Sequence, residues 1–323
     1  GCIVTPGLID IHTHCYPKSF LGLRPDVLGL ERGSTTILDA GSSGADTYED
    51  FRKENIEKSK TKVFTLLNVS REGLLHGHEL DDPAKIDEEG LIKILQKYGD
   101  NIVGLKARAS ASVVGEQGFL PIARAARLAK QVQKPLMVHV GNCPPALPQV
   151  LAALGKGDIV THAWHGKAGG LLTERGEIIP EAIKARERGV LFDVGHGVAS
   201  FSLRVYQKAL AAGFDCDLIS TDLHVENYEG PVYSLVAVIN KLIGCGEGLE
   251  TAIHKCTCAP ARYLGLGELG ELKQGFIADF TIMEYTDCRE EVTDAVGEVM
   301  MLEKKLRLKK TIYSRGEESE IFE

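Results

Sequence analysis

The stretch 7–14 constrains this chain most, because an apolar segment ends there in two histidines one residue apart. The run Leu-Ile-Asp-Ile over 8–11 has the composition of a buried β-strand. Residues i and i+2 of a strand share a face, so His12 and His14 would present two imidazoles side by side. The pattern predicts a pair of metal ligands where a strand meets a loop, although solvated histidines on an exposed strand would give the same letters.

Composition excludes several classes of protein. The chain has 323 residues, of which 44% are hydrophobic and 25% charged, enough for one large globular domain and a smaller one. A net charge of -8 argues against nucleic acid or an anionic membrane as partner. No apolar run approaches the roughly 20 residues of a membrane span, and no signal-peptide pattern opens the sequence, so a cytoplasmic location is expected. Eight scattered cysteines without zinc-knuckle spacing are interpreted as reduced thiols.

Strand-like apolar runs alternate with helical ones along most of the chain. Strands are predicted over 8–11, 34–40, 62–69, 102–106, 135–139, 158–162, 189–194 and 217–222, and helices over 46–58, 88–98, 120–133, 146–154, 181–188 and 203–212. Eight strands with intervening helices predict an α/β fold, a (β/α)8 TIM barrel. The alternative, a doubly wound sheet, would need fewer units and a phosphate loop, and no such glycine pattern follows a strand.

Ionisable side chains stand at the ends of five of these strands. They are His12 and His14 after the first strand, Lys106 after the fourth, His139 after the fifth, His162 after the sixth and Asp222 after the eighth. In such a barrel the carboxyl ends of the strands form the active site, so the six side chains would converge on one mouth. Taken singly, each could be a structural histidine, a surface lysine or a capping aspartate. Six at corresponding positions favour a single site.

These motifs together resemble the amidohydrolase superfamily of metal-dependent hydrolases. The matching features are Pro-Gly-Leu-Ile-Asp-x-His-x-His over 6–14, Lys106 in Gly-Leu-Lys, His139 in Val-His-Val, His162 in Thr-His and Asp222 in Ser-Thr-Asp. The stretches 258–261 and 270–279 resemble the family's exit from the barrel and its return to a small β-sandwich. The resemblance covers nearly the whole chain. It implies a barrel over 5–264 and a sandwich remnant made of 1–4 and 265–323.

The same resemblance implies a binuclear centre. His12, His14 and Asp222 would hold one divalent metal, His139 and His162 a second, and a carboxylated Lys106 would bridge them. The metal most often implied is Zn²⁺. Because a lysine ammonium is a poor ligand, Lys106 can serve only when neutral or as a carbamate formed with CO₂. A metal-bridging hydroxide would attack the carbonyl carbon of an amide or ester, and Asp222 would carry its proton to the leaving group.

Two positions narrow the branch of the family. Dihydroorotases usually carry an arginine where this chain has Tyr16, and adenine deaminases usually carry a glutamate where it has Lys106. The stretches 104–108, 193–197 and 230–233 look most like the dihydroorotase-like group that includes deacetylases of acylated hydroxy or amino acids. The expected function is hydrolysis of an acetylated, carboxylate-bearing small molecule. Cyclic amide hydrolysis of the dihydroorotase type, deamination of the adenine deaminase type and a non-catalytic metal-binding barrel are alternatives.

Other residues are candidates for substrate contacts. Arg108, two residues after Lys106, could grip a substrate carboxylate through two parallel hydrogen bonds, or it could pair with an acidic loop residue. His196, after the seventh strand, is expected to touch substrate. His165 could replace His162 as a ligand. Loop or structural roles are expected for the remaining histidines, which are His76, His78, His224 and His254.

The two ends of the chain carry further expectations. The resemblance implies N-terminal strands before Gly1, so the sandwich is expected to lack part of its sheet. A strand is predicted over 276–283, and 292–305 could be strand or helix. The expected partner is a small-molecule substrate, and a homo-oligomer is compatible with the sequence.

Overall fold

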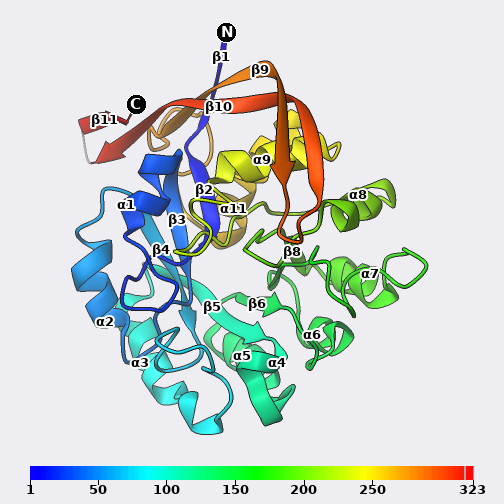
Figure 1. Cartoon of the computed structure of the whole chain (residues 1–323). Helices are drawn as coiled ribbons and strands as arrows, with labels where there is room; N and C mark the ends of the chain where they lie inside the picture. The colour runs from blue at the N-terminus through cyan, green and yellow to red at the C-terminus, as the bar shows by residue number, and fades with distance from the viewer. Residues whose placement is uncertain (316–317, 323) are drawn as a thin grey trace.

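A curled parallel sheet and a smaller antiparallel sheet organise the molecule, as the computed structural model shows for residues 1–315 and 318–322 (Figure 1). The parallel sheet contains β2 (Leu8–Thr13), β3 (Ser34–Ala40), β4 (Lys62–Asn68), β5 (Ile102–Ala109), β6 (Leu136–Val140), β7 (Ile159–Thr161) and β8 (Leu191–Asp193). Neighbouring strands pair in the order of the sequence. This alternating α/β arrangement is the one predicted from the sequence.

The eighth barrel position is irregular, which corrects the prediction of a strand over 217–222. In the described part of the chain the segment forms no regular ladder with β8 or β2, and its β-bridges to them are isolated, Asp193 to Leu218 and Thr13 to Leu223. Between these bridges, the backbone N–H of Thr221 donates to the carboxylate of Asp10 at 3.1 Å instead of to a strand carbonyl. A side chain therefore replaces part of the ladder where the sheet closes on itself.

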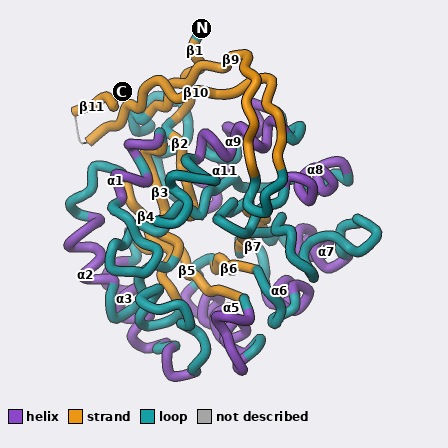
Figure 2. The backbone as a smooth tube through the Cα atoms, in the orientation of Figure 1, coloured by secondary structure: helices purple, strands orange, loops and turns teal. Residues whose placement is uncertain are grey.

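Helices lie around the outside of the strands (Figure 2). They are α1 (Pro25–Leu28), α2 (Tyr48–Phe51), α3 (Glu88–Tyr98), α4 (Ala111–Val114), α5 (Leu120–Val132), α6 (Leu147–Ala153), α7 (Pro180–Glu187), α8 (Leu203–Ala211), α9 (Leu235–Gly244), α10 (Leu249–His254) and α11 (Cys258–Leu264). Short turns of helix occur at Leu30–Arg32, Arg52–Ile56, Pro83–Lys85 and Gly115–Gln117. Local sequence explains several starts: Asp87 accepts from the N–H of Gly90 to cap α3, and Ser234 accepts from Ala237 to cap α9. No helix in the described part of the chain has the length and apolar character needed to cross a bilayer.

The barrel interior is apolar at one end and polar at the other. Alternate strand residues point inward. Those at the amino ends of the strands, such as Ile9, Val103 and Met137, form one buried cluster with residues of α11 such as Leu264. This apolar plug closes the bottom of the barrel, so the polar side chains at the carboxyl ends of the strands surround the opposite mouth.

The small sheet is antiparallel, with strand order β1-β9-β10-β11. It contains β1 (Cys2–Pro6), β9 (Phe280–Thr293), β10 (Val299–Arg315) and β11 (Glu318–Phe322). The stretch 292–305 therefore contains no helix, and the strand predicted from 276 begins at Phe280. In Figure 1 the β9–β10 hairpin curves over the barrel, with α9 beneath it. Asn240 of α9 exchanges two hydrogen bonds with the backbone of Leu306, at 2.9 and 2.7 Å.

The tip of this hairpin is bonded to the start of α8. Asp294 accepts from the backbone N–H of Leu203 at 2.8 Å. Glu298 accepts from the hydroxyl of Ser202 and from the N–H of Arg204. The small sheet thus supplies side-chain caps to a barrel helix whose first N–H groups would otherwise lack partners.

Candidate metal centre

The two histidines of the first motif lie at the carboxyl end of β2, buried and oriented by hydroxyl groups. Nδ1 of His12 lies 2.9 Å from Oγ1 of Thr161, and Nδ1 of His14 lies 3.0 Å from Oγ of Ser42. Their Nε2 atoms lie 3.2 and 3.1 Å from the same oxygen of Asp222. The strand thus brings both imidazoles to one carboxylate, as the i, i+2 spacing predicts.

A buried network fixes the tautomer of His12. The hydroxyl of Thr161 donates to the carboxylate of Asp193 at 2.6 Å, and Ser220 donates to the same oxygen at 2.6 Å. Having given its proton to Asp193, the Thr161 oxygen can only accept from His12, which places a hydrogen on Nδ1. The lone pair of Nε2 is therefore directed toward Asp222 and Lys106. Burial, with Lys106 nearby, also holds the pKa of His12 well below its usual value, so the imidazole is neutral.

Asp222 follows the irregular eighth segment and has a left-handed backbone, with φ of 55°. For a non-glycine residue this conformation costs of order 1–3 kcal/mol. Its backbone carbonyl accepts from the side chain of Asn227 at 2.7 Å, and the preceding Thr221 donates its hydroxyl to Asp10 at 2.6 Å. Burial would raise the pKa of Asp222, but four neighbouring histidines outweigh it and hold that pKa well below the ordinary value. The carboxylate is ionised at the mouth.

Lys106 lies on β5 and is 1% exposed. The sequence predicted that this strand ends at Lys106, but β5 continues to Ala109, so Lys106 stands three residues before the strand end. Its Nζ lies 2.9 Å from Nε2 of His12 and 3.5 Å from the sulfur of Met137. No carboxylate of a described residue pairs with it within 4.0 Å. Burial lowers the pKa of this lysine to about 7.

His139 on β6 and His162 after β7 face each other, with ring centroids 4.3 Å apart and an interplanar angle of 77°. Nδ1 of His162 donates to the carbonyl of Gly195, which leaves Nε2 free of a proton. This Nε2 is buried, has no hydrogen-bond partner among the described residues, and lies 3.9 Å from the second oxygen of Asp222. Burial holds the pKa of both histidines far below the usual value, to about 3 for His162. A buried lone pair without a donor indicates that a ligand belongs there.

The donor set fits a divalent metal. One ligand atom each from His12, His14 and Asp222 lies within 4.8 Å of the others, a grouping that could hold an ion. Neutral imidazole and carboxylate are the ligands that Zn²⁺ and similar first-row ions prefer. The unpartnered Nε2 of His162 adds a donor on the other side of Asp222.

The two candidate substrate contacts are engaged within the protein. Arg108 forms a two-bond ion pair with Glu79, at 2.5 and 2.7 Å, and donates to the carbonyl of Gly77. Its Nη1 has no hydrogen bond to a described residue. The ring of His196 is fully buried, with Nδ1 donating to Gly197 and Nε2 lying 2.9 Å from Nζ of Lys241. His196 has no free ring nitrogen to offer a ligand.

The other histidines have local roles. Nδ1 of His165 accepts from the backbone of Lys167, and Nδ1 of His224 accepts from that of Glu226. His76 and His78 are exposed in the loop after β4, and His254 is exposed at the end of α10.

Sequence reasoning missed the residues that support the ligands. Asp10, Thr161 and Asp193 all lie at or near carboxyl ends of barrel strands, so the rule that found the histidines could have included them. Glu79 and Lys241 had no such signal, because each meets its partner across a long sequence separation.

Comparison with known proteins agrees with this geometry. The model of the amidohydrolase family matches residues 3–314. The chain belongs to the amidohydrolase family. A deacetylase from Enterococcus faecalis is 38% identical over 320 residues, covering 97% of this chain and 85% of that protein. A deacetylase from Agrobacterium fabrum is 36% identical, covering 94% of this chain and 76% of its own.

Solved structures resemble the amidohydrolase chain closely. The crystal structure of an adenine deaminase superposes with a TM-score of 0.94 at 38% identity, covering 97% of this chain and 86% of that one. The crystal structure of a dihydroorotase gives 0.91 at 34%, covering 98% and 85%. The barrel, the family and hydrolytic chemistry on small molecules are therefore established for this enzyme, whereas the relatives carry three different activity names.

Proposed function

We propose that this amidohydrolase removes an acetyl group from a small, carboxylate-bearing metabolite by hydrolysing an amide or ester bond. The observation that carries the proposal is the buried convergence of His12, His14 and His162 on Asp222, with Lys106 beside them. Relatives that are 36–38% identical are named deacetylases, which supports acetyl as the group that is removed. These names agree with the branch of the family that the sequence motifs favour.

In this proposal His12, His14 and Asp222 would hold one divalent ion, His139 and His162 would hold a second, and Lys106 would serve both as a carbamate; the ligand chemistry favours Zn²⁺. The carbamate is supported by the surroundings of Lys106: it is buried, faces a histidine lone pair and forms no direct ion pair with a carboxylate of the described residues. Bound divalent metals supply acidified water and polarisation of the scissile carbonyl.

The protein's own groups have distinct roles. Asp222 lies between the two sets of histidines, so its free carboxylate oxygen can take a proton from the attacking water and return it to the leaving group. Arg108 would bind the substrate carboxylate through Nη1, while Glu79 keeps the guanidinium in place. His196, with both ring nitrogens engaged, would act on substrate only by shaping the wall of the mouth.

The alternatives account less well for this site. Dihydroorotase-type binding would use a cation at the position of Tyr16, but that side chain is buried and its hydroxyl donates to Asp50 at 2.8 Å. Adenine deaminase-type chemistry is disfavoured by Lys106, a lysine where that branch usually has a glutamate. A non-catalytic metal-binding barrel would use the same ligands, so turnover is what separates it from the proposed enzyme.

Metal analysis followed by a substrate panel tests the proposal. The purified protein should bind two Zn²⁺ per chain and hydrolyse acetyl esters or acetyl amides of small acids faster than dihydroorotate, hydantoins or adenine. His139→Asn should lose about one metal equivalent, whereas His254→Asn, a change at an exposed histidine, should lose none. Turnover of only dihydroorotate or adenine would replace the proposed substrate class, and no turnover with full metal content would favour the non-catalytic alternative.

A further inference from the structure

Lys241 of α9 is a buried cation that forms no ion pair with a carboxylate of the described residues. The residue is 1% exposed, and its Nζ donates to the carbonyl of Pro231 at 2.7 Å and to Nε2 of His196 at 2.9 Å. No carboxylate of a described residue lies within ion-pair distance, and burial lowers the pKa of the amine to about 8. A charged group in this position costs stability that an apolar side chain would not cost. The interaction with His196 is the specific contact that this lysine provides.

The ring of His196 is locked by its neighbours. Nδ1 donates to the carbonyl of Gly197 at 2.9 Å, so Nε2 must accept from Lys241. Phe201 stacks on the ring with centroids 4.9 Å apart and an interplanar angle of 30°. Lys241 therefore fixes both the tautomer and the orientation of this imidazole.

The turn that carries His196 touches two proposed metal ligands. The carbonyl of Gly195 accepts from Nδ1 of His162, which directs Nε2 of that histidine into the site. The N–H of Gly197 donates to the carbonyl of Thr221 at 2.9 Å, next to Asp222. A Cβ added to Gly197 would lie 2.7 Å from a carboxylate oxygen of Asp222, so the backbone of this turn packs directly against that carboxylate.

We propose that Lys241 is a positioning residue, which holds His196 and thereby presses the 195–197 turn against His162 and Asp222. The inference rests on the proposed function, in which His162 and Asp222 are metal ligands. In this way α9, which lies outside the mouth, would influence the orientation of two proposed ligands, His162 and Asp222.

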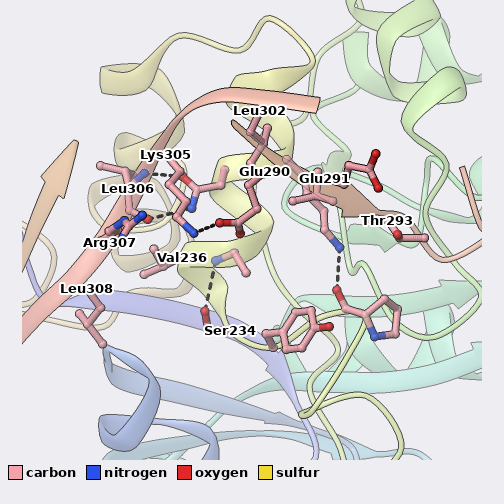
Figure 3. A pocket seen from close by; sticks show the side chains of 16 residues that line it. Ser234, Val236, Glu290, Glu291, Thr293, Leu302, Lys305, Leu306, Arg307 and Leu308 are labelled. Carbon is pink, nitrogen blue, oxygen red and sulfur yellow. Dashed lines mark hydrogen bonds and ion pairs between the residues drawn. The ribbon is translucent and has the colours of Figure 1, made fainter. Parts of the chain in front are cut away.

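A cavity beside Lys241 is lined by a second lysine, which offers a matched control variant for the test. The space of about 480 Å³ lies between α9 and the β9–β10 hairpin, and both Lys241 and Lys305 line it (Figure 3). Lys305 comes from the hairpin side and points toward Glu290, with which it forms an ion pair. Lys305→Met therefore removes a lysine from the same cavity without touching the 195–197 turn.

The test measures Zn²⁺ binding to the metal-free protein by titration calorimetry, with kcat and KM measured on an acetylated substrate. Lys241→Met should weaken Zn²⁺ binding about tenfold, the lower end of what loss of a ligand-orienting contact usually costs. It should lower kcat while leaving KM within about twofold, since no substrate contact is removed. Lys241→Arg should recover part of the affinity, and Lys305→Met should match the wild type. Equal Zn²⁺ affinity in Lys241→Met and Lys305→Met would overturn the proposal.

A second variant tests the link from the other side. His196→Phe keeps an aromatic ring against Phe201 but removes both nitrogens, so it should weaken Zn²⁺ binding as Lys241→Met does, even if the lysine variant does not fold. The double variant should bind no more weakly than either single one, because both break the same connection. Additive losses would show that Lys241 does not act through His196. A wild type that binds Zn²⁺ but hydrolyses nothing in the panel would refute the proposed function and leave this binding test intact.

Discussion

Thr161→Val should loosen the metal centre without changing any ligand. The hydroxyl of Thr161 connects Nδ1 of His12, at 2.9 Å, to the carboxylate of Asp193, at 2.6 Å. Valine keeps the shape of the side chain but cannot accept from the histidine or donate to the aspartate. His12 then loses the contact that fixes its tautomer, and its Nδ1 hydrogen is buried without a partner.

The magnitude follows from the two hydrogen bonds that are lost. Each hydrogen bond lost in the interior costs about 1–3 kcal/mol, so the free energy of unfolding of the metal-free protein should fall by about 2–6 kcal/mol. Zn²⁺ affinity should fall about 10–100-fold, the usual effect of removing the group behind a histidine ligand. The loss should concern the metal that His12 holds, since the Thr161 hydroxyl bonds to His12 and Asp193, whereas the carbonyl of Gly195 orients the ring of His162.

The assay compares Thr161→Val with Thr161→Ser, which keeps the hydroxyl and loses only a methyl group. Urea unfolding of both metal-free variants gives the stability difference, and competition with a chelator gives Zn²⁺ affinity. Equal affinity in the two variants would show that His12 is held by the strand alone and that the hydroxyl network has no part in binding metal.

Further changes separate the roles within the site. Asp222→Asn should retain metal but lose most of kcat, since the shape is kept while proton transfer fails; near-wild-type turnover would remove Asp222 from that role. Lys106→Ala should bind at most one metal tightly and regain activity with short carboxylic acids, whereas two tight metals and unchanged turnover would exclude a bridge. Arg108→Met should raise KM strongly for acidic substrates and little for their neutral amides, and an equal effect on both would exclude carboxylate binding. Burial would raise the pKa of Asp26, but hydrogen bonds from the 59–61 turn outweigh it and lower that pKa, so the carboxylate stabilises the fold above about pH 4. Asp26→Asn should therefore lower the melting temperature at pH 5–8, with the difference shrinking as pH falls through the depressed pKa; a pH-independent difference would contradict this.

Much of the barrel was predictable because its strands are continuous apolar runs and its helices are amphipathic. The strand at Ser34–Ala40 and the helix at Glu88–Tyr98 have the predicted bounds. The prediction of an eighth strand was wrong because a period-2 pattern cannot reveal that the N–H of Thr221 donates to the side chain of Asp10 and not to a strand carbonyl. Helix α9 received no prediction, since Leu235–Gly244 is mostly apolar, and such a run can be taken for a buried strand as easily as for a buried helix.

The candidate site follows the same division. The grouping of the proposed ligands was predictable because each stands near the carboxyl end of a strand, and barrel geometry brings those ends together. The ion pair of Arg108 with Glu79 and the contact of Lys241 with His196 were not, because they join loops and helices whose approach depends on the folded structure. Side-chain pairing across such distances leaves no local pattern in the sequence.

The caps on α8 have a consequence for the order of synthesis. Asp294, which accepts from the N–H of Leu203, lies 91 residues further along the chain. While the protein is being made, the barrel strands can leave the ribosome long before the groups that complete this helix and brace the adjoining Phe201. We therefore expect the turn at His196 to reach its final conformation last, after the β9–β10 hairpin has docked. The newly made barrel would have a functional site at its mouth only from then on.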